Sequence, residues 1–196
     1  GYKYGSIGYP LPDMYFKIVE PDSHKPVEPC VDGEICISGP TVMLEYLNDP
    51  KETNQVLRVH EDGNVWLHTG DIGCMDKDGT IFFKQRIKRI IVSSGYNVYP
   101  SYIENVILSH PKVEACTVIG VPHPYRGQVA KAYIVLKQGI DLNGEIKKEI
   151  KELCNKNISY YAIPNEYEYI EKMPTTLVGK VAFKKLEESN NDEKEK

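Results

Sequence analysis

The sequence has no long hydrophobic run, no excess of positive charge and no paired cysteine motif. No stretch approaches the roughly 20 apolar residues of a membrane span, and the first residues lack the apolar segment of a secretory signal. These absences predict a cytoplasmic protein without a transmembrane segment. A formal net charge of −4 argues against nucleic acid as a main partner, because phosphate backbones bind basic surfaces.

Cysteine is sparse and scattered. The five cysteines are odd in number and form no CxxC pair, so neither a disulfide framework nor a zinc site is expected. Reduced thiols, some of them packed as small hydrophobic side chains, are the simpler interpretation. We therefore predict no metal ligand in the chain. The residues concerned are Cys30, Cys36, Cys74, Cys116 and Cys154.

The content of apolar residues, 41%, is sufficient for a hydrophobic core in one or two domains. The pattern of the first eighty residues predicts short strands separated by Gly and Pro turns. Asp78-Gly79 predicts a hairpin between residues 72–75 and 80–83. Asp49-Pro50 predicts the start of a short helix, with Asp49 as its cap. This half of the chain is therefore predicted to be rich in β-structure.

The pattern changes after Gln85. We predict helices at residues 100–109, 143–154 and 181–186, and strands at 115–121, 129–136 and 166–170. The predicted fold class is α+β, with the domain boundary close to residues 84–88. The charged tail is predicted to be disordered.

Three segments could carry chemistry. The first is residues 68–71, His-Thr-Gly-Asp, in which the carboxylate of Asp71 could accept hydrogen bonds from both hydroxyls of a ribose. Taken alone, such an aspartate more often bonds its own backbone in a turn.

The second segment runs from Gln85 to Pro100. Arg86 offers a planar set of donors for ribose or phosphate oxygens, and Ser94-Gly95 would let a narrow ligand pass close to the backbone. The plainer alternative is an exposed basic strand followed by an ordinary glycine turn.

The third segment is residues 173–180, which ends in Gly179-Lys180. A lysine on a glycine-containing loop can reach into a cleft and offset developing negative charge. Most lysines are simply solvated, so this segment too is weak evidence by itself.

The order and spacing of the three segments together are more specific than any one segment alone. Asp71 precedes Arg86 by fifteen residues with a hairpin between them, Ser94-Gly95 follows, and Lys180 lies near the end. This set resembles the ANL superfamily of adenylate-forming enzymes: acyl- and aryl-CoA synthetases, nonribosomal peptide adenylation domains and luciferases. The resemblance covers the whole chain except the charged tail, and extends to residues 5–12, 33–35, 39–40 and 66–71.

The resemblance implies a fold and a division into domains. Residues 1–85 would form a small β-rich subdomain, a distorted antiparallel barrel, of a large AMP-binding domain. Residues 86–188 would form a compact α/β lid with a central three-stranded sheet flanked by helices, and residues 189–196 a disordered tail.

It also implies roles for individual residues. Asp71 matches the aspartate that binds both ribose hydroxyls, Arg86 the arginine that contacts ribose and phosphate, and Phe83 an apolar residue beside the nucleoside. Lys180 matches the catalytic lysine that bridges the carboxylate and the α-phosphate during adenylation. Lys88 falls at the hinge about which the lid turns, and Ser94 and Gly95 match the lining of the pantetheine tunnel for CoA.

The sequence departs from the family pattern in two places. Gln85 replaces the glycine that precedes the arginine, which affects the hinge backbone but leaves the guanidinium available. Residues 90–92, Ile-Ile-Val, replace a lysine found after the hinge in luciferases and many adenylation domains, which favours a CoA ligase. Residues 121–128 look most like bacterial medium- or long-chain acyl-CoA synthetases.

The resemblance further implies the substrates and partners. A carboxylic acid and ATP would form an acyl-adenylate, and CoA would then displace AMP. The phosphate loop and acyl pocket of the family would lie upstream of Gly1 in an N-terminal domain, so the chain alone is expected to be inactive. Mg²⁺ is expected in the full enzyme, with no ligand in this fragment. The alternatives are an adenylation domain with a carrier-protein acceptor, and a non-catalytic interaction module.

Overall fold

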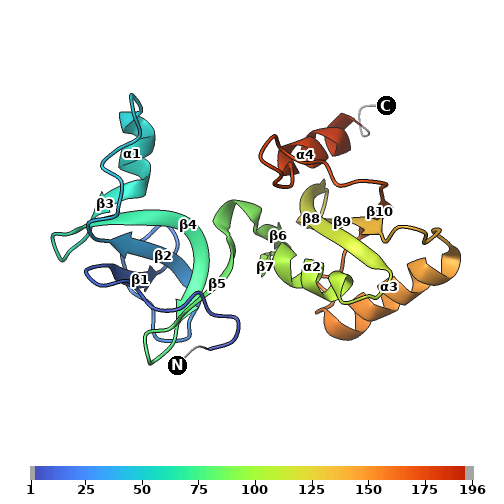
Figure 1. Ribbon diagram of the computed structural model, residues 1–196, viewed down its shortest axis with the longest axis horizontal. Helices are drawn as coiled ribbons and strands as arrows, with labels where there is room; N and C mark the ends of the chain where they lie inside the picture. The colour runs from blue at the N-terminus through green and yellow to red at the C-terminus, as the bar shows by residue number, and fades with distance from the viewer. Residues whose placement is uncertain (1–2, 193–196) are drawn as a thin grey trace. The chain divides into compact units, whose positions relative to one another are not determined.

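The computed structural model describes residues 3–192, and the side chains of residues 3–190 (Figure 1). The chain divides into two compact units, Gly1–Lys88 and Arg89–Lys196. The α+β fold class is confirmed, because each unit combines an antiparallel or mostly antiparallel sheet with helices. Within the described residues, no helix has the length and apolar character needed to cross a membrane.

The first unit is built on one antiparallel sheet. Its strands are β1 (Tyr15–Val19), β2 (Gly33–Ser38), β3 (Leu57–Val59), β4 (Val65–Met75) and β5 (Ile81–Arg86). Their order is β1-β2-β4-β3, and β5 also pairs with β4. Helix α1 (Pro50–Val56) begins as predicted, with the Asp49 carboxylate accepting a hydrogen bond from the backbone N–H of Glu52.

The predicted barrel is not closed among the described residues, and the sheet is an open one. Closure requires both edge strands to pair. The outer edge of β1 is instead taken up by the segment that follows it, through a bridge between Val19 and Pro26 and a hydrogen bond from Val27 N–H to the carbonyl of Ile18. The turn after β1 therefore covers the edge that a barrel would need.

The second unit contains five strands where three were predicted. They are β6 (Ile91–Ser93), β7 (Tyr96–Val98), β8 (Val113–His123), β9 (Gly127–Leu136) and β10 (Glu166–Tyr169), in the order β10-β9-β6-β7 with β8 also paired to β9. Among the described strands of this unit, only β10 runs parallel to its neighbour. The hairpin β6–β7 was missed because three-residue strands are too short to show a periodic pattern.

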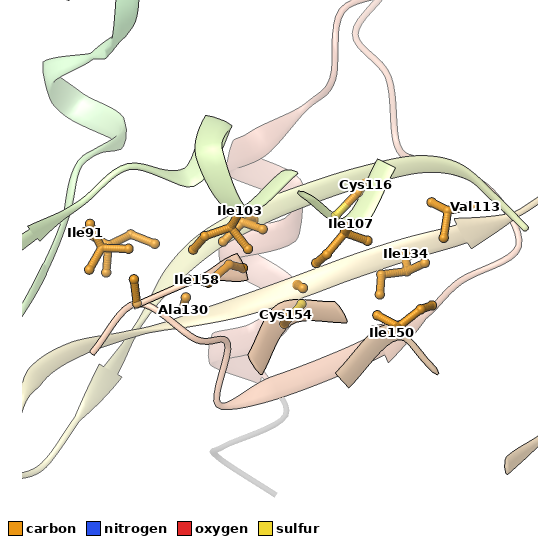
Figure 2. Close-up of a cluster of buried hydrophobic side chains, with 14 of the residues drawn as sticks. Ile91, Ile103, Ile107, Val113, Cys116, Ala130, Ile134, Ile150, Cys154 and Ile158 are labelled. Atoms are coloured by element: carbon orange, nitrogen blue, oxygen red, sulfur yellow. The ribbon is translucent and has the colours of Figure 1, made fainter. Parts of the chain in front are cut away.

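Two helices of this unit cover a shared hydrophobic core. Helix α2 (Pro100–Leu108) contributes Ile103 and Ile107, and α3 (Gly144–Asn157) contributes Ile150 and Cys154, all fully buried with Ile134 of β9 (Figure 2). Burying each isoleucine side chain is worth roughly 1.5–3 kcal/mol. This core makes the second unit a stable platform for its exposed loops.

The last helix extends into the segment for which disorder was predicted. Helix α4 (Phe183–Asp192) includes residues 189–192, and residues 193–196 lie outside the described residues. Leu186 and Asn190, one helical turn apart, are both buried. The Asn190 side chain accepts a hydrogen bond from Lys131, which explains why the helix continues through a charged sequence.

Candidate functional site

Asp71 and Arg86 face each other across the β4–β5 hairpin. They are direct partners in the antiparallel register, and Arg86 Nε lies 2.8 Å from Asp71 Oδ1. The turn between the strands is held by Asp76, whose carboxylate accepts hydrogen bonds from the backbone N–H groups of Asp78 and Thr80. The hairpin predicted from Asp78-Gly79 is therefore confirmed, and it brings two of the predicted site residues together.

A groove of about 430 Å³ opens beside this pair. Asp71, Arg86 and Lys88 line it together with residues of α1 and β4. Its wall combines apolar side chains with charges of both signs, which is suited to a ligand that has hydroxyl and phosphate groups beside an apolar part. Arg86 is mostly exposed, with 63% of its side chain accessible, so its guanidinium remains available to such a ligand.

The Asp71 carboxylate has spare capacity to accept hydrogen bonds. Burial raises its pKa, the guanidinium of Arg86 opposes that rise, and the negative charge of Glu34 adds to it. Oδ1 is buried, and although it is close to Arg86 Nε it accepts no aligned hydrogen bond from the described part of the chain. The Asp71 side chain as a whole is 22% exposed, so the carboxylate can accept hydrogen bonds from a ligand hydroxyl on its open side.

A buried carboxylate under the strand holds the site in place. Glu34 of β2 pairs with His68 Nδ1 at 2.8 Å through one oxygen and accepts the backbone N–H of Gly70 at 3.0 Å through the other. Burial raises the pKa of Glu34, but the donors from His68 and Gly70 outweigh it and leave the pKa below its ordinary value. Gly70 has φ +70°, a conformation that favours glycine.

Sequence reasoning did not assign Glu34 a role, although a signal was present. Glu34 begins a run of apolar residues in β2 and is only 5% exposed. A carboxylate in such a position must be paired, because burying an isolated charge is unfavourable. Its partner could not be identified, since His68 lies 34 residues away.

Phe83 does not join Asp71 and Arg86 among the residues that line the groove. It lies on β5 opposite Gly73, and 44% of it is exposed. Its proposed place beside a nucleoside remains a prediction. Gln85, the departure from the family pattern, is buried, and its side-chain Nε2 finds no hydrogen-bond partner within residues 3–190.

Ser94 and Gly95 form the tight turn of the β6–β7 hairpin. Both have positive φ, 51° and 83°, as required at the two central positions of a type I′ turn. The backbone N–H of Ser94 donates to the carbonyl of Arg126, which anchors the turn to the neighbouring loop. Apart from the two residues next to it in the chain, no described atom lies within 4 Å of the position that a Cβ on Gly95 would occupy, so the outer face of the turn is open.

Lys180 lies on an exposed hairpin-like loop of the second unit. A bridge between Thr175 and Val181 closes the loop, and the hydroxyl and backbone of Thr176 bond to the backbone of Lys180. Buried Met173 and Ala182 hold the two ends. The loop therefore presents an exposed ammonium from an anchored base, as the sequence predicted; the catalytic role of Lys180 remains a prediction.

Lys88 lies in a single 3₁₀ turn (Ile87–Arg89) and is the last residue of the first compact unit. Its side chain is exposed. The next residue, Arg89, is anchored inside the second unit by an ion pair with Glu104 and by its position over the ring of Phe183. A short turn between one unit and the anchored start of the other is consistent with a pivot.

Comparisons with known proteins agree with this description. Residues 1–47 match the AMP-binding enzyme family, and residues 102–180 match the AMP-binding enzyme C-terminal domain. The long-chain-fatty-acid–CoA ligase of Bacillus subtilis is 38% identical over 97% of the chain. The chain spans 32% of that protein, about a third of its length.

Solved structures are similar over nearly the whole chain. One is o-succinylbenzoate-CoA synthetase (MenE) from Bacillus subtilis in complex with the acyl-adenylate intermediate OSB-AMP, with a TM-score of 0.82 and 33% identity. Another is the amide bond synthetase McbA from Marinactinospora thermotolerans, with a TM-score of 0.81 and 31% identity. In both cases 94% of this chain aligns with 36% of the other.

Proposed function

Since this chain belongs to the ANL superfamily of adenylate-forming enzymes, we propose that it is the C-terminal part of an AMP-forming acyl-CoA synthetase. The full enzyme would convert a carboxylic acid and ATP to an acyl-adenylate and pyrophosphate, and then transfer the acyl group to CoA with release of AMP. A medium- or long-chain fatty acid is the proposed substrate, supported by the similarity to the fatty-acid ligase of Bacillus subtilis.

The observation that carries this proposal is the paired Asp71 and Arg86 at the wall of the groove. Asp71 supplies a partly exposed carboxylate as acceptor for the hydroxyls of a ribose, and Arg86 supplies an exposed cation for a phosphate. One nucleotide offers both groups a short distance apart. The pair is therefore proposed to bind the ribose and phosphate of ATP and of the adenylate.

Lys180 is proposed to act in the first half-reaction. Bringing a carboxylate against the α-phosphate crowds negative oxygens, and a positioned ammonium stabilises that charge. The second half-reaction needs a thiol near the same adenylate, and the open turn at Ser94-Gly95 is proposed to line its path. A rotation at Lys88 would exchange the two loops at one site.

The experiment is a screen of carboxylic acids with the full-length enzyme. We expect the consumption of ATP, acid and CoA in equal amounts, with AMP, pyrophosphate and acyl-CoA as products and highest kcat/KM for a medium- or long-chain acid. A lack of AMP formation with every acid would count against an adenylate-forming activity and favour a non-catalytic module. The 196-residue chain assayed alone is the control, and it is expected to be inactive.

A different acceptor is the main alternative, because the similar structures include an amide bond synthetase. The same screen distinguishes it. If acid-dependent pyrophosphate release occurs and CoA gives no thioester, while an amine or a carrier-protein thiol is acylated, the acceptor assigned here is wrong and the adenylation step stands.

A further inference from the structure

Three histidines from separate elements of the first unit meet at the side of the sheet. His24 lies in the turn after β1, His60 in the tight turn between β3 and β4, and His68 within β4. One ring nitrogen of each lies within 4.8 Å of the corresponding nitrogens of the other two. His60 and His68 are buried, whereas His24 is exposed.

The two buried rings are already close enough to share an ion. His60 Nε2 and His68 Nε2 are 2.9 Å apart. A zinc–nitrogen bond of about 2.0–2.1 Å places two ligand nitrogens of a tetrahedral site about 3.4 Å apart, so a shift of a few tenths of an ångström would admit the metal. The rings of His24 and His60 are stacked with centroids 4.3 Å apart, so the exposed ring of His24 has to turn for its nitrogen to complete the set.

The surroundings have the form of a metal site. His68 Nδ1 bonds to the Glu34 carboxylate at 2.8 Å, which orients the ring and leaves Nε2 facing His60. Carboxylate partners of this kind commonly orient histidine ligands of metals. His60 is only 4% exposed, so its Nε2 and that of His68 face each other away from solvent.

A metal ion can reach the exposed histidine, and the charged side chains around the three histidines, taken together, do not oppose a cation. A surface cavity of about 460 Å³ is lined by His24 together with Asp22, Lys25 and Glu61, and it gives an ion access to the exposed histidine. Two lysines near the cluster have acidic partners: Lys17 is paired with Asp62 and Lys25 with Glu20, both at 2.9 Å. Glu34 adds a buried negative charge on the opposite side of His68.

A second set of potential ligands, Glu34, Cys36 and His68, is less suitable. Both oxygens of Glu34 are engaged, one with His68 Nδ1 and the other with the backbone N–H of Gly70. A metal there would have to break these bonds. Three imidazoles with an open fourth position instead suit zinc and the similar ions cobalt and nickel.

We propose that His24, His60 and His68 form a binding site for one zinc ion, in which Glu34 orients His68 and a water molecule completes the coordination. The site would join the turn after β1 and the β3–β4 turn to β4, the strand that also carries Asp71. Its role would be to stabilise this edge of the first unit. The proposal does not depend on the acyl-CoA synthetase activity.

The test is zinc binding by the full chain after metal is removed with a chelator. Titration calorimetry should give one zinc ion per chain, and zinc should raise the Tm while Mg²⁺ does not, because Mg²⁺ prefers oxygen ligands. Cobalt should give the absorption of a tetrahedral site without a thiolate charge-transfer band, which excludes binding by cysteines. A thiolate band, or no saturable binding, would overturn the proposal.

Variants make the test specific. Glu34→Gln should weaken zinc binding about 10- to 100-fold, as loss of an orienting partner does, and His24→Ala should weaken it at least as much. His24 is exposed, so its replacement leaves the fold intact and isolates the effect on the metal. His123→Ala, in the second unit and outside the cluster, is the matched control and should bind zinc normally. Unchanged affinity in His24→Ala and in His60→Gln would refute the site.

Discussion

Asp71 and Arg86 are direct partners in the β4–β5 register, and the guanidinium of Arg86 lies 2.8 Å from a carboxylate whose pKa burial raises and Arg86 lowers. The pair keeps an acidic acceptor and a cation at one wall of the groove. This relationship depends on a hairpin of fixed register, so the geometry follows from the backbone rather than from flexible side chains. The first prediction addresses it.

Replacing Asp71 with alanine should impair nucleotide binding in the full-length enzyme. The loss of hydrogen bonds to a charged acceptor should raise the KM for ATP about ten- to a hundredfold. Steady-state pyrophosphate release measures this effect. The exposed Asp78→Ala variant, in the same hairpin, should not change the KM. If Asp71→Ala keeps the wild-type KM, the assignment of Asp71 to the ribose is wrong.

Replacing Lys180 with alanine should separate the two half-reactions. Loss of the ammonium should slow acid-dependent pyrophosphate exchange on the order of a hundredfold or more, and spare thioester formation from a supplied acyl-adenylate. Exposed Lys172→Ala, in the same unit, is the control and should be active in both steps. Equal damage to both half-reactions by Lys180→Ala would contradict the proposed role.

Replacing Lys88 with proline should restrict the pivot. Proline fixes φ and limits the residue before it, so the turn between the units can no longer absorb a change in backbone angles. Thioester formation should fall more than adenylation, measured by single-turnover experiments on each step. Lys88→Ala removes the charge but keeps the backbone free, and should retain both steps. Normal CoA transfer in Lys88→Pro would remove the hinge assignment.

Glu34 should make the stability of the first unit depend on pH. Its pKa is lowered in the folded state, so its contribution is present above the ordinary value and is lost as the pH falls below that value toward the folded pKa. Glu34→Gln should lower the free energy of unfolding at pH 7 by about 1–3 kcal/mol, because the buried donors of His68 and Gly70 lose a charged acceptor.

Denaturant unfolding of the chain at several pH values measures this difference. The difference in free energy of unfolding between wild type and Glu34→Gln should become smaller as the pH falls below the ordinary pKa range of a glutamate. Exposed Glu28→Gln should match the wild type at every pH. If that difference in free energy of unfolding stays constant down to strongly acidic pH, the charge of Glu34 contributes nothing to stability.

The sequence by itself determined the elements that depend on local signals. Asp78-Gly79 predicted the hairpin that joins β4 to β5, since a glycine turn is a short-range signal. The register that places Asp71 opposite Arg86 also depends on a bulge between Ile72 and Gly73, which the turn does not encode. Asp49-Pro50 predicted the start of α1, because capping and proline act within one turn. The order of these motifs also carried the family resemblance.

Only the tertiary structure decided which distant groups meet. Glu34 and His68 are 34 residues apart in the sequence, and His24, His60 and His68 come from three separate segments. The prediction of no metal ligand came from the lack of metal-ligand spacing in the sequence, and it remains a prediction that zinc titration of the chain would test. Such contacts depend on strand order and on which face of the sheet each side chain occupies, and neither is encoded in the spacing of residues along the chain.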